Sequence, residues 1–188
     1  SNMLENSGYE VTKEYYVNDA GRQISILTSS ILLKAYIKNF DIDGMYEGAY
    51  IAELAQEFFK DNGELNVALK SEELSDDKEK ALDQICEYFQ SNHSEAWEAA
   101  KNFSVTNILS TIKQELHSFN IVHDSWFHES SLGSIQDSDS DLSKSLSAIE
   151  KAGHTFTRDD AIWFKTTEFK DDKDRVLLRE NGEPTYYL

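Results

Sequence analysis

The fold class is decided by the stretch Tyr9-Glu-Val-Thr-Lys-Glu-Tyr-Tyr-Val17 and by the segment Asn18-Asp-Ala-Gly-Arg-Gln23 that follows it. The aromatic and β-branched residues of the first stretch are typical of a strand. The second segment has the polar residues and the glycine of a turn. Apolar residues then recur at helical spacing from Ile24 to Ile37. A strand, a turn and a helix in this order begin an α/β unit, so we predict an α/β fold.

Helical patterns dominate the middle of the chain, and strand patterns dominate its end. Helices are predicted over residues 1–7, 49–60, 75–89, 97–101, 106–119 and 141–152. The third of these has Ser75 or Asp76 as its candidate N-cap. The helix at 106–119 is expected to turn its apolar residues inward, namely Ile108, Leu109, Ile112 and Leu116. Strands are predicted over 120–127, 154–157, 161–166, 175–179 and 184–188, with Asn181-Gly182 as a hairpin turn between the last two.

The composition is that of an acidic protein with a packed core. The 188 residues include 18 Lys and Arg against 35 Asp and Glu, which gives a formal net charge of −17. In a complete protein this charge disfavours nucleic-acid binding, because contacts to phosphate need clustered basic side chains. The 10 Phe, 9 Tyr and 3 Trp supply apolar material for a core. No apolar run approaches the ~20 residues of a membrane span, so we expect no membrane partner.

General motifs for catalysis, metals or nucleotides do not occur in the sequence. The five histidines have no metal-ligand spacing, and the single cysteine, Cys86, lies on an apolar helical stripe. The segment Asp41-Ile-Asp43-Gly44 lacks the other ligand positions of a calcium loop. Glycine patterns of nucleotide-binding loops and of nucleophile elbows are also absent. We therefore predict no metal site and no catalytic residue within these residues.

Four blocks of sequence carry a resemblance to one family. The first is Tyr15-Tyr-Val-Asn-Asp-Ala-Gly-Arg-Gln-Ile24, and the second, Tyr46-Glu-Gly-Ala-Tyr-Ile51, follows the pattern Tyr-x-Gly-x-Tyr-Ile. The third, His123-Asp-Ser-Trp-Phe-His-Glu-Ser-Ser-Leu132, is similar to Phe-Asp-x-Trp-x-Ser-Glu-x-Ser-Leu. The fourth joins Ala161-Ile-Trp-Phe-Lys-Thr-Thr-Glu-Phe169, Asp172-Lys-Asp-Arg-Val-Leu-Leu-Arg179 and Asn181-Gly-Glu-Pro-Thr-Tyr186. In this order the blocks resemble bacterial-type arginyl-tRNA synthetases, which are class I aminoacyl-tRNA synthetases.

The resemblance implies a particular architecture and a fragment of a larger enzyme. It implies part of a Rossmann-like, nucleotide-binding catalytic domain with a mainly helical connective insertion. We expect residues 1–38 to form the edge of the catalytic fold, residues 39–158 the insertion, and residues 159–188 strands that return to the catalytic fold. The family's His-x-Gly-His and KMSKS-like ATP-binding signatures are missing from the sequence. We therefore expect an internal fragment of the catalytic domain, with Ser1-Asn2 either native or a cloning remnant.

The activity that the resemblance implies belongs to the parent enzyme. Such a ligase activates arginine with Mg-ATP and transfers it to tRNA(Arg) for translation, in the cytoplasm. We expect the fragment alone to be inactive and to bind no cofactor. Its unpaired strands, at residues 11–17 and 185–188, are expected to let it self-associate. In a fragment, the charge of −17 describes one surface of an enzyme that binds tRNA elsewhere.

The resemblance also assigns candidate arginine-binding residues. Tyr186 stands where the family has a tyrosine that helps to hold the arginine side chain. By pattern alone it is an ordinary strand aromatic, and the resemblance favours the arginine contact in the intact enzyme. Asp19 and Gln23 are expected to edge the substrate pocket, because α/β folds place ligands at strand-to-helix turns. Asn18 and Gly21 are turn and capping residues near that pocket, and capping or packing also explains Asp19 and Gln23.

Two other interpretations of the sequence stay open. The first is a stand-alone acidic module that uses the same fold to bind protein partners. The second is a small hydrolase or metal enzyme, for which the sequence offers no constellation of residues.

Overall fold

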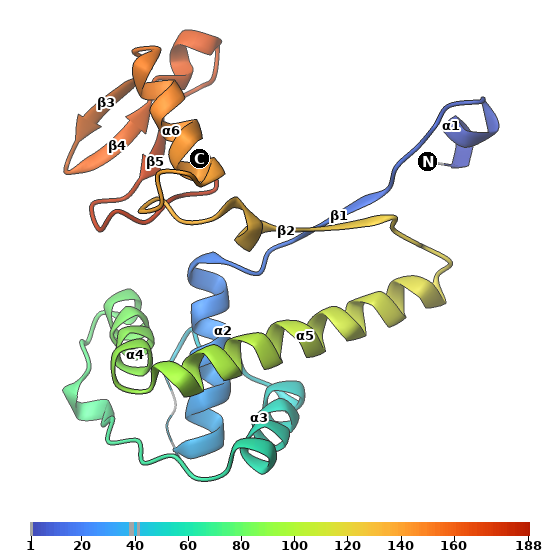
Figure 1. The fold of residues 1–188 in the computed structure, drawn as a ribbon. Helices are drawn as coiled ribbons and strands as arrows, with labels where there is room; N and C mark the ends of the chain where they lie inside the picture. Colours follow the sequence, from blue (N-terminus) through green and yellow to red (C-terminus); the bar gives the residue numbers. More distant parts are fainter. Residues whose placement is uncertain (1, 38–39, 41) are drawn as a thin grey trace. The chain divides into compact units, whose positions relative to one another are not determined.

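The computed structural model describes residues 2–37, 40 and 42–188, and it divides into two compact units (Figure 1). The N-terminal unit extends to Trp126, and the C-terminal unit is Phe127–Leu188. The boundary expected between residues 38 and 39 lies outside the described residues.

The N-terminal unit begins with a short helix and a short strand. Helix α1 (Asn2–Asn6) agrees with the predicted helix at the start of the chain. Strand β1 (Glu14–Val17) is shorter than the predicted strand at 9–17. It pairs with the four residues of β2 (Ser125–His128), and a strand can extend only as far as its partner continues the ladder.

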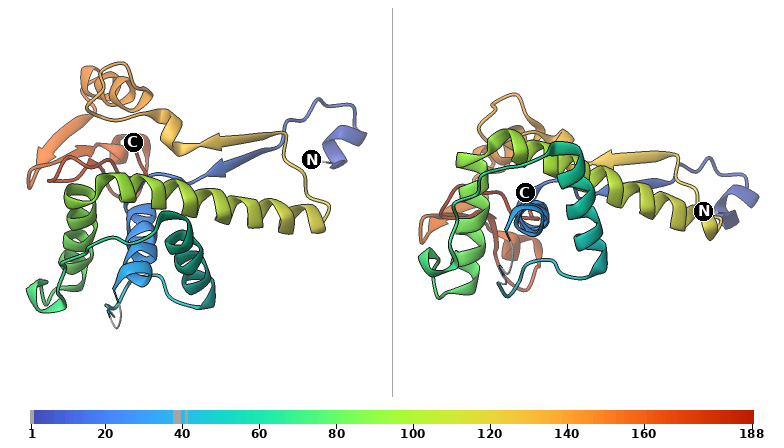
Figure 2. Two further views of the ribbon diagram at one scale, coloured as in Figure 1. Left: turned by 60° about the horizontal axis from the view of Figure 1, so that its bottom comes forward. Right: turned by 90° about the horizontal axis from the view of Figure 1, so that it is seen from below.

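Four helices form the main body of this unit. They are α2 (Gly21–Tyr36), α3 (Ala49–Asn62), α4 (Lys78–Asn92) and α5 (Ser94–Ser118), with a 3-10 turn η1 (Ser71–Glu73) before α4. Seen along its axis, α2 lies at the centre with the other three around it (Figure 2). A continuous run of α2, residues 26–33, is therefore buried, which is the pattern of a helix with neighbours on several sides.

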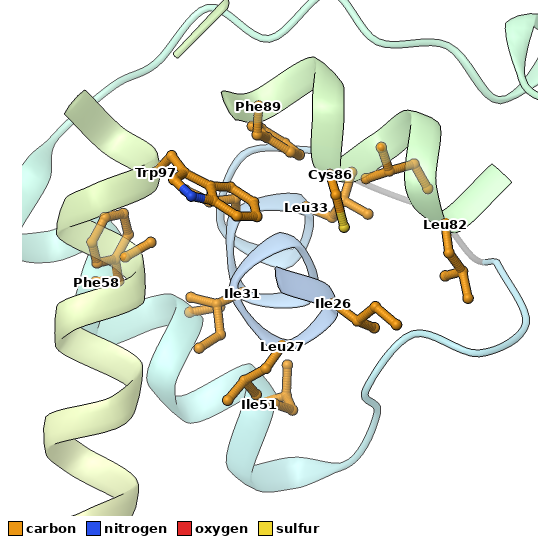
Figure 3. Packing of buried hydrophobic residues seen from close by; sticks show 14 residues of the cluster. Ile26, Leu27, Ile31, Leu33, Ile51, Phe58, Leu82, Cys86, Phe89 and Trp97 are labelled. Atoms are coloured by element: carbon orange, nitrogen blue, oxygen red, sulfur yellow. The ribbon is translucent and has the colours of Figure 1, made fainter. Parts of the chain in front are cut away.

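The helices meet in one hydrophobic core (Figure 3). Ile31 and Leu32 of α2, Phe58 of α3, and Ile85 and Phe89 of α4 are almost completely buried. The apolar helical stripe on which Cys86 lies is thus confirmed as a core face. The N-cap of α4 is Asp77, whose carboxylate accepts a hydrogen bond from the Lys80 backbone N–H. This cap lies one residue after Asp76, the nearer of the two predicted caps.

Helix α5 corrects two sequence predictions. It is a single helix of 25 residues, where two separate helices were expected. The residues between the predicted segments include no glycine or proline, and Ser104 and Asn107 hydrogen-bond to carbonyls of their own helix, at Lys101 and Phe103. The apolar residues expected to point inward from its second half are only half-buried, because the fully buried residues of α5 end at Ser104.

The C-terminal unit packs one helix against a three-stranded antiparallel sheet. Helix α6 (Asp141–Lys151) contributes Leu146 to a small core with Leu177 and Leu178 of the sheet. The strands β3 (Thr155–Arg158), β4 (Ala161–Phe164) and β5 (Arg175–Leu178) are ordered β3-β4-β5. Two 3-10 turns, η2 (Glu129–Leu132) and η3 (Thr166–Phe169), complete the unit. The prediction of mixed helices and strands is confirmed.

The last predicted strand is mostly replaced by turns. Asn181-Gly182 forms the predicted turn, with Gly182 at φ +78°, a conformation that glycine adopts without strain. Pairing is then limited to the bridge between Leu178 and Pro184 and to the bond from the Thr185 N–H to the Leu177 carbonyl, 2.8 Å. The Leu188 N–H turns back to the Thr185 carbonyl, so residues 185–188 form no strand.

Within the described residues, the structure contains no helix that is both long enough and apolar enough to cross a membrane.

Candidate functional site

The turn between β1 and α2 holds three of the predicted site residues. Asp19 is 9% exposed, and its N–H donates to the Val17 carbonyl at 3.1 Å. The N-cap position of α2 is occupied by Ala20, whose side chain cannot cap the helix. Gly21 follows with φ +76°, and a Cβ added there would meet no atom within 4 Å. Backbone conformation, and not crowding, therefore requires glycine at this turn.

Gln23 connects the first sequence block to the second. Its Oε1 accepts a hydrogen bond of 3.0 Å from the hydroxyl of Tyr46. Tyr46 is itself held by the buried Ser30, whose Oγ accepts from the Tyr46 N–H at 2.9 Å and donates to the Ile26 carbonyl at 2.7 Å. The structure thus brings Gln23 together with Tyr46, which sequence reasoning had not assigned to the site. The shared family resemblance of the two blocks was the signal that could have suggested it.

A groove of about 570 Å³ lies next to Tyr46, between α2, α3 and α5. Its polar lining includes Tyr46, Tyr50, Glu53 and Glu57, while its apolar lining comes from leucine and isoleucine side chains. Burial is the main cause that raises the pKa of Tyr50 above its ordinary value, and Tyr46 adds to it. Sequence reasoning missed this groove, although the spacing of Glu53 and Glu57 places both carboxylates on one face of α3.

Arg22, in the same turn, is used for structure. Its Nε lies 2.7 Å from an Asp83 carboxylate oxygen, and its Nη1 lies 2.9 Å from Glu79, so it ties the start of α2 to α4. Burial lowers the pKa of Arg22, but the hydrogen bonds and charges of Asp83 and Glu79 together outweigh burial and raise it overall. Its charge is therefore committed to these two carboxylates.

An aromatic cluster links the first block to the third. The ring of Tyr15 stacks on Trp126 with centroids 4.6 Å apart, and His123 meets both rings edge-on. The Lys113 ammonium lies 4.5 Å from the centre of the Trp126 ring. Among the described residues, the His123 Nδ1 is buried without a hydrogen-bond partner. The cluster fastens the end of α5 and the segment before β2 to β1.

Tyr186, the predicted arginine contact, lies in the C-terminal unit and is 91% exposed. Its ring is nearly perpendicular to that of Tyr187, at 82°, with centroids 6.1 Å apart. The two tyrosines differ in their contacts, because the Tyr187 hydroxyl accepts a hydrogen bond of 3.1 Å from Nη1 of Arg175. Tyr186 is thus an exposed aromatic next to an anchored one.

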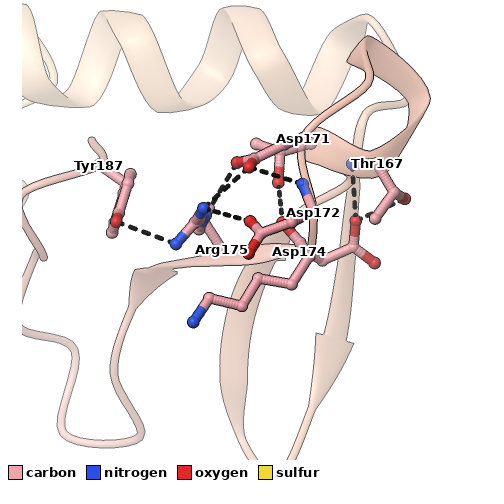
Figure 4. Close-up of polar contacts among 8 residues, drawn as sticks. Thr167, Asp171, Asp172, Asp174, Arg175 and Tyr187 are labelled. Carbon is pink, nitrogen blue, oxygen red and sulfur yellow. Dashed lines mark hydrogen bonds and ion pairs between the residues drawn. The ribbon is translucent and has the colours of Figure 1, made fainter.

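Arg175 is the centre of a charged network (Figure 4). Its Nε and Nη2 each lie 2.8 Å from a different carboxylate oxygen of Asp171, and Nη2 is also 2.7 Å from Asp172. The hydrogen bond to Arg175 is the main cause that lowers the pKa of Asp171, and the same bond raises the pKa of Arg175. The charge of Arg175 is therefore committed to Asp171 and Asp172.

The next carboxylate, Asp174, holds the 3-10 turn that precedes this network. Its Oδ1 accepts from the Thr167 N–H at 3.1 Å and from the Thr167 hydroxyl at 2.8 Å. The backbone hydrogen bond, followed by the hydroxyl, lowers the pKa of Asp174. In the parts of the chain that the structure describes, no three His, Cys, Asp or Glu side chains gather as a metal site would require.

This chain is similar to known proteins over nearly its whole length. No family model matches the chain. The arginine–tRNA ligase of Psychrobacter arcticus is 35% identical over 212 residues, which cover 100% of this chain and 34% of the ligase. The arginine–tRNA ligase of Legionella pneumophila strain Corby is 38% identical over 99% of this chain and 33% of its own length. The chain is homologous to part of the arginine–tRNA ligases.

Solved structures agree with this relationship. A Campylobacter jejuni protein described as a candidate arginyl-tRNA synthetase superposes with a TM-score of 0.65 at 29% identity, over 98% of this chain and 35% of that one. The chain thus spans about one third of the length of the arginine–tRNA ligases that it matches. The resemblance carried by the four blocks is confirmed, and the comparisons give no support to a stand-alone binding module. The roles of Tyr186, Gln23 and Asp19 stay predictions.

Proposed function

We propose that the chain is part of an arginine–tRNA ligase, and that the intact enzyme activates arginine with ATP and transfers it to tRNA(Arg). The observation that carries this proposal is the match to arginine–tRNA ligases over the whole chain. In the first step the arginine carboxylate attacks the α-phosphate of ATP, which gives arginyl-adenylate and releases pyrophosphate. The terminal adenosine of the tRNA then takes the arginyl group and AMP leaves. Positioning and charge stabilisation carry most of the rate in such reactions.

The residues of this chain fit a role in holding arginine. The exposed phenol of Tyr186 can stack on a planar guanidinium or accept a hydrogen bond from it. The same proposal assigns the Asp19 carboxylate and the Gln23 amide to the edge of the substrate pocket. Gln23 is oriented by the Tyr46 hydroxyl at 3.0 Å, which limits the conformations that its amide can adopt.

The proposal extends to the architecture of the longer enzyme. We assign residues 1–38 and 159–188 to a Rossmann-like class I catalytic domain, and residues 39–158 to its connective insertion. The His-x-Gly-His and KMSKS-like signatures do not occur between Ser1 and Leu188, so ATP activation depends on other parts of the ligase. The cytoplasm, where translation takes place, is the expected compartment. Residues 1–188 alone are expected to form no adenylate. The premise of unpaired strands was wrong, because β1 pairs with β2 and residues 185–188 form no strand. Self-association through β1 stays a proposal.

The test is arginine-dependent exchange of pyrophosphate into ATP, with tRNA(Arg) present. It is measured side by side on residues 1–188 and on the longer protein that the gene encodes. Exchange is expected only in the longer protein. Exchange by residues 1–188 alone would show that the ATP-activating groups lie within this chain. A gene that encodes no ligase sequence beyond these residues would contradict the proposal.

A further inference from the structure

We propose that Arg175 is a positioning residue for arginine binding, because it fixes Tyr187 and thereby presents the neighbouring Tyr186 to the substrate. The inference rests on the proposed contact between Tyr186 and arginine. It adds to that proposal a residue that does not itself bind the substrate and acts through the backbone between the two tyrosines.

The first step is the way in which Arg175 is itself held. The planar guanidinium has five N–H donors in a fixed fork, which suits several partners at once. Asp171 occupies one edge through both of its oxygens, and Asp172 shares Nη2. Only Nη1 is directed at an aromatic hydroxyl, that of Tyr187. Because the other donors are fixed by carboxylates, the direction of Nη1 is fixed too.

The second step is the path of the chain around Tyr186. Thr185 is anchored to β5, through its N–H to the Leu177 carbonyl and its hydroxyl to the Val176 carbonyl. Leu188 packs against the small core around Leu146. Tyr187 is held by Arg175, whose guanidinium carbon also lies 5.1 Å from the centre of the Tyr187 ring. Tyr186 therefore stands, highly exposed, between anchored neighbours, and fixing them fixes the backbone at Tyr186 and the direction in which its side chain leaves the chain.

The third step concerns charge. An unpaired arginine so close to Tyr186 would repel the guanidinium of the substrate. Asp171 and Asp172 give the network two negative charges against the one positive charge of Arg175. The network can therefore anchor Tyr187 without opposing the approach of a cation. Lysine at position 175 would keep the charge but not the fork, so it could not hold both Asp171 oxygens and Tyr187 in this geometry.

The kinetic experiment compares variants of the longer ligase. R175Q is expected to raise the KM for arginine roughly tenfold with a smaller change in kcat, since misplacing a binding group costs ground-state and transition-state contacts alike. Y187F removes only the acceptor of Arg175 and is expected to raise the KM about threefold. R175K should not restore the wild-type KM. Arg179, on the same hairpin, provides the control, and R179Q is expected to leave the KM unchanged.

A structural measurement separates positioning from general damage. In residues 1–188, the backbone NMR order of Tyr186 and Tyr187 is expected to fall in R175Q and Y187F, while β3 and β4 keep the wild-type values. If Y186A leaves the KM for arginine unchanged, the proposed contact of Tyr186 is wrong and the inference falls with it. If Y186A raises the KM while Y187F and R175Q behave like R179Q, the contact holds and the positioning role of Arg175 is wrong.

Discussion

The two units of the molecule are stabilised by different means. In the N-terminal unit, four helices bury one extensive apolar core that includes Phe58, Phe89 and Trp97. In the C-terminal unit, the buried apolar cluster is limited to Leu146, Leu177 and Leu178, and charged hydrogen bonds fix the segments around it. Apolar burial depends little on pH, whereas carboxylate hydrogen bonds do. The units should therefore respond differently to core truncation, to acid and to salt.

The largest effect is expected from opening the core of the N-terminal unit. Phe58 is 1% exposed and its neighbour Phe59 is 40% exposed, which makes them a matched pair on α3. We expect F58A to lower the free energy of unfolding by about 3–5 kcal/mol, because it removes buried apolar surface and leaves a cavity. F59A should cost less than about 1 kcal/mol. Urea unfolding followed by circular dichroism measures both, and equal losses would show that α3 does not pack as described.

A smaller loss is expected from the same kind of change in the C-terminal unit. Leu177 is fully buried in a cluster with few members. We expect L177A to cost about 2–3 kcal/mol, near the lower end for leucine, because the small cluster can relax around the cavity. Val176, half-buried in the same strand, is the control. Urea unfolding followed through the NMR signals of β5 gives the comparison, and a loss above that of F58A would reverse the ranking of the two cores.

Acid should affect the C-terminal unit through Asp171 and Asp174. The pKa of each is lowered in the folded state, so each stabilises the fold at pH values above its unfolded pKa, near 3.9. This stabilisation is lost as the pH falls below about 4 toward the folded pKa. The melting temperature of the C-terminal unit, followed through the NMR signals of β5, should fall on acidification. This fall should be smaller in D174N than in wild type. D159N, at an exposed carboxylate, serves as the control. If acid lowers the melting temperature of D174N as much as that of wild type, this explanation is wrong.

The smallest effect is expected from the ion pair that joins α2 to α4. D83N removes the closest carboxylate of Arg22 at a largely exposed position, so we expect a loss of about 0.5–1 kcal/mol. Salt screens such pairs, and the difference from wild type should shrink in 1 M NaCl. E87Q, on the same helix, is the control for removing a carboxylate charge from α4. A difference that grows with salt would mean that Asp83 acts through something other than its charge.

Local sequence patterns predicted helices well and strands less well. The apolar periodicity in α3 and α4 is set by residues within each helix, so it could be read directly. The four-residue length of β1 depends on β2, more than a hundred residues away, and no local pattern contains that information. Helix α5 was predicted as two segments, 97–101 and 106–119, but Ser104 between them hydrogen-bonds to the Lys101 carbonyl of its own turn and the helix continues.

Part of the candidate site could also have been found from sequence. The resemblance pointed to Gln23 and Tyr186. Tyr46, the partner of Gln23, and Arg175, which hydrogen-bonds to Tyr187 beside Tyr186, are identified from contacts in the folded chain. The contact of Arg175 with Tyr187 could have been predicted from the sequence, because the hairpin turn at Asn181-Gly182 brings residues 175 and 187 opposite each other. For the bond between Tyr46 and Gln23 the local pattern holds no signal, and only the family resemblance of the two blocks linked these residues.

The turn at Gly21 has a consequence for chirality. Its φ of +76° is disfavoured for L-amino acids, yet the space where a Cβ would stand is open. The position therefore restricts the chirality of the residue that stands there and not the size of its side chain. A D-alanine introduced there by chemical ligation should fit, and should stabilise the fold by restricting the unfolded chain, whereas L-alanine should strain it. In this respect, one backbone position beside the candidate arginine site is complementary to a mirror-image residue.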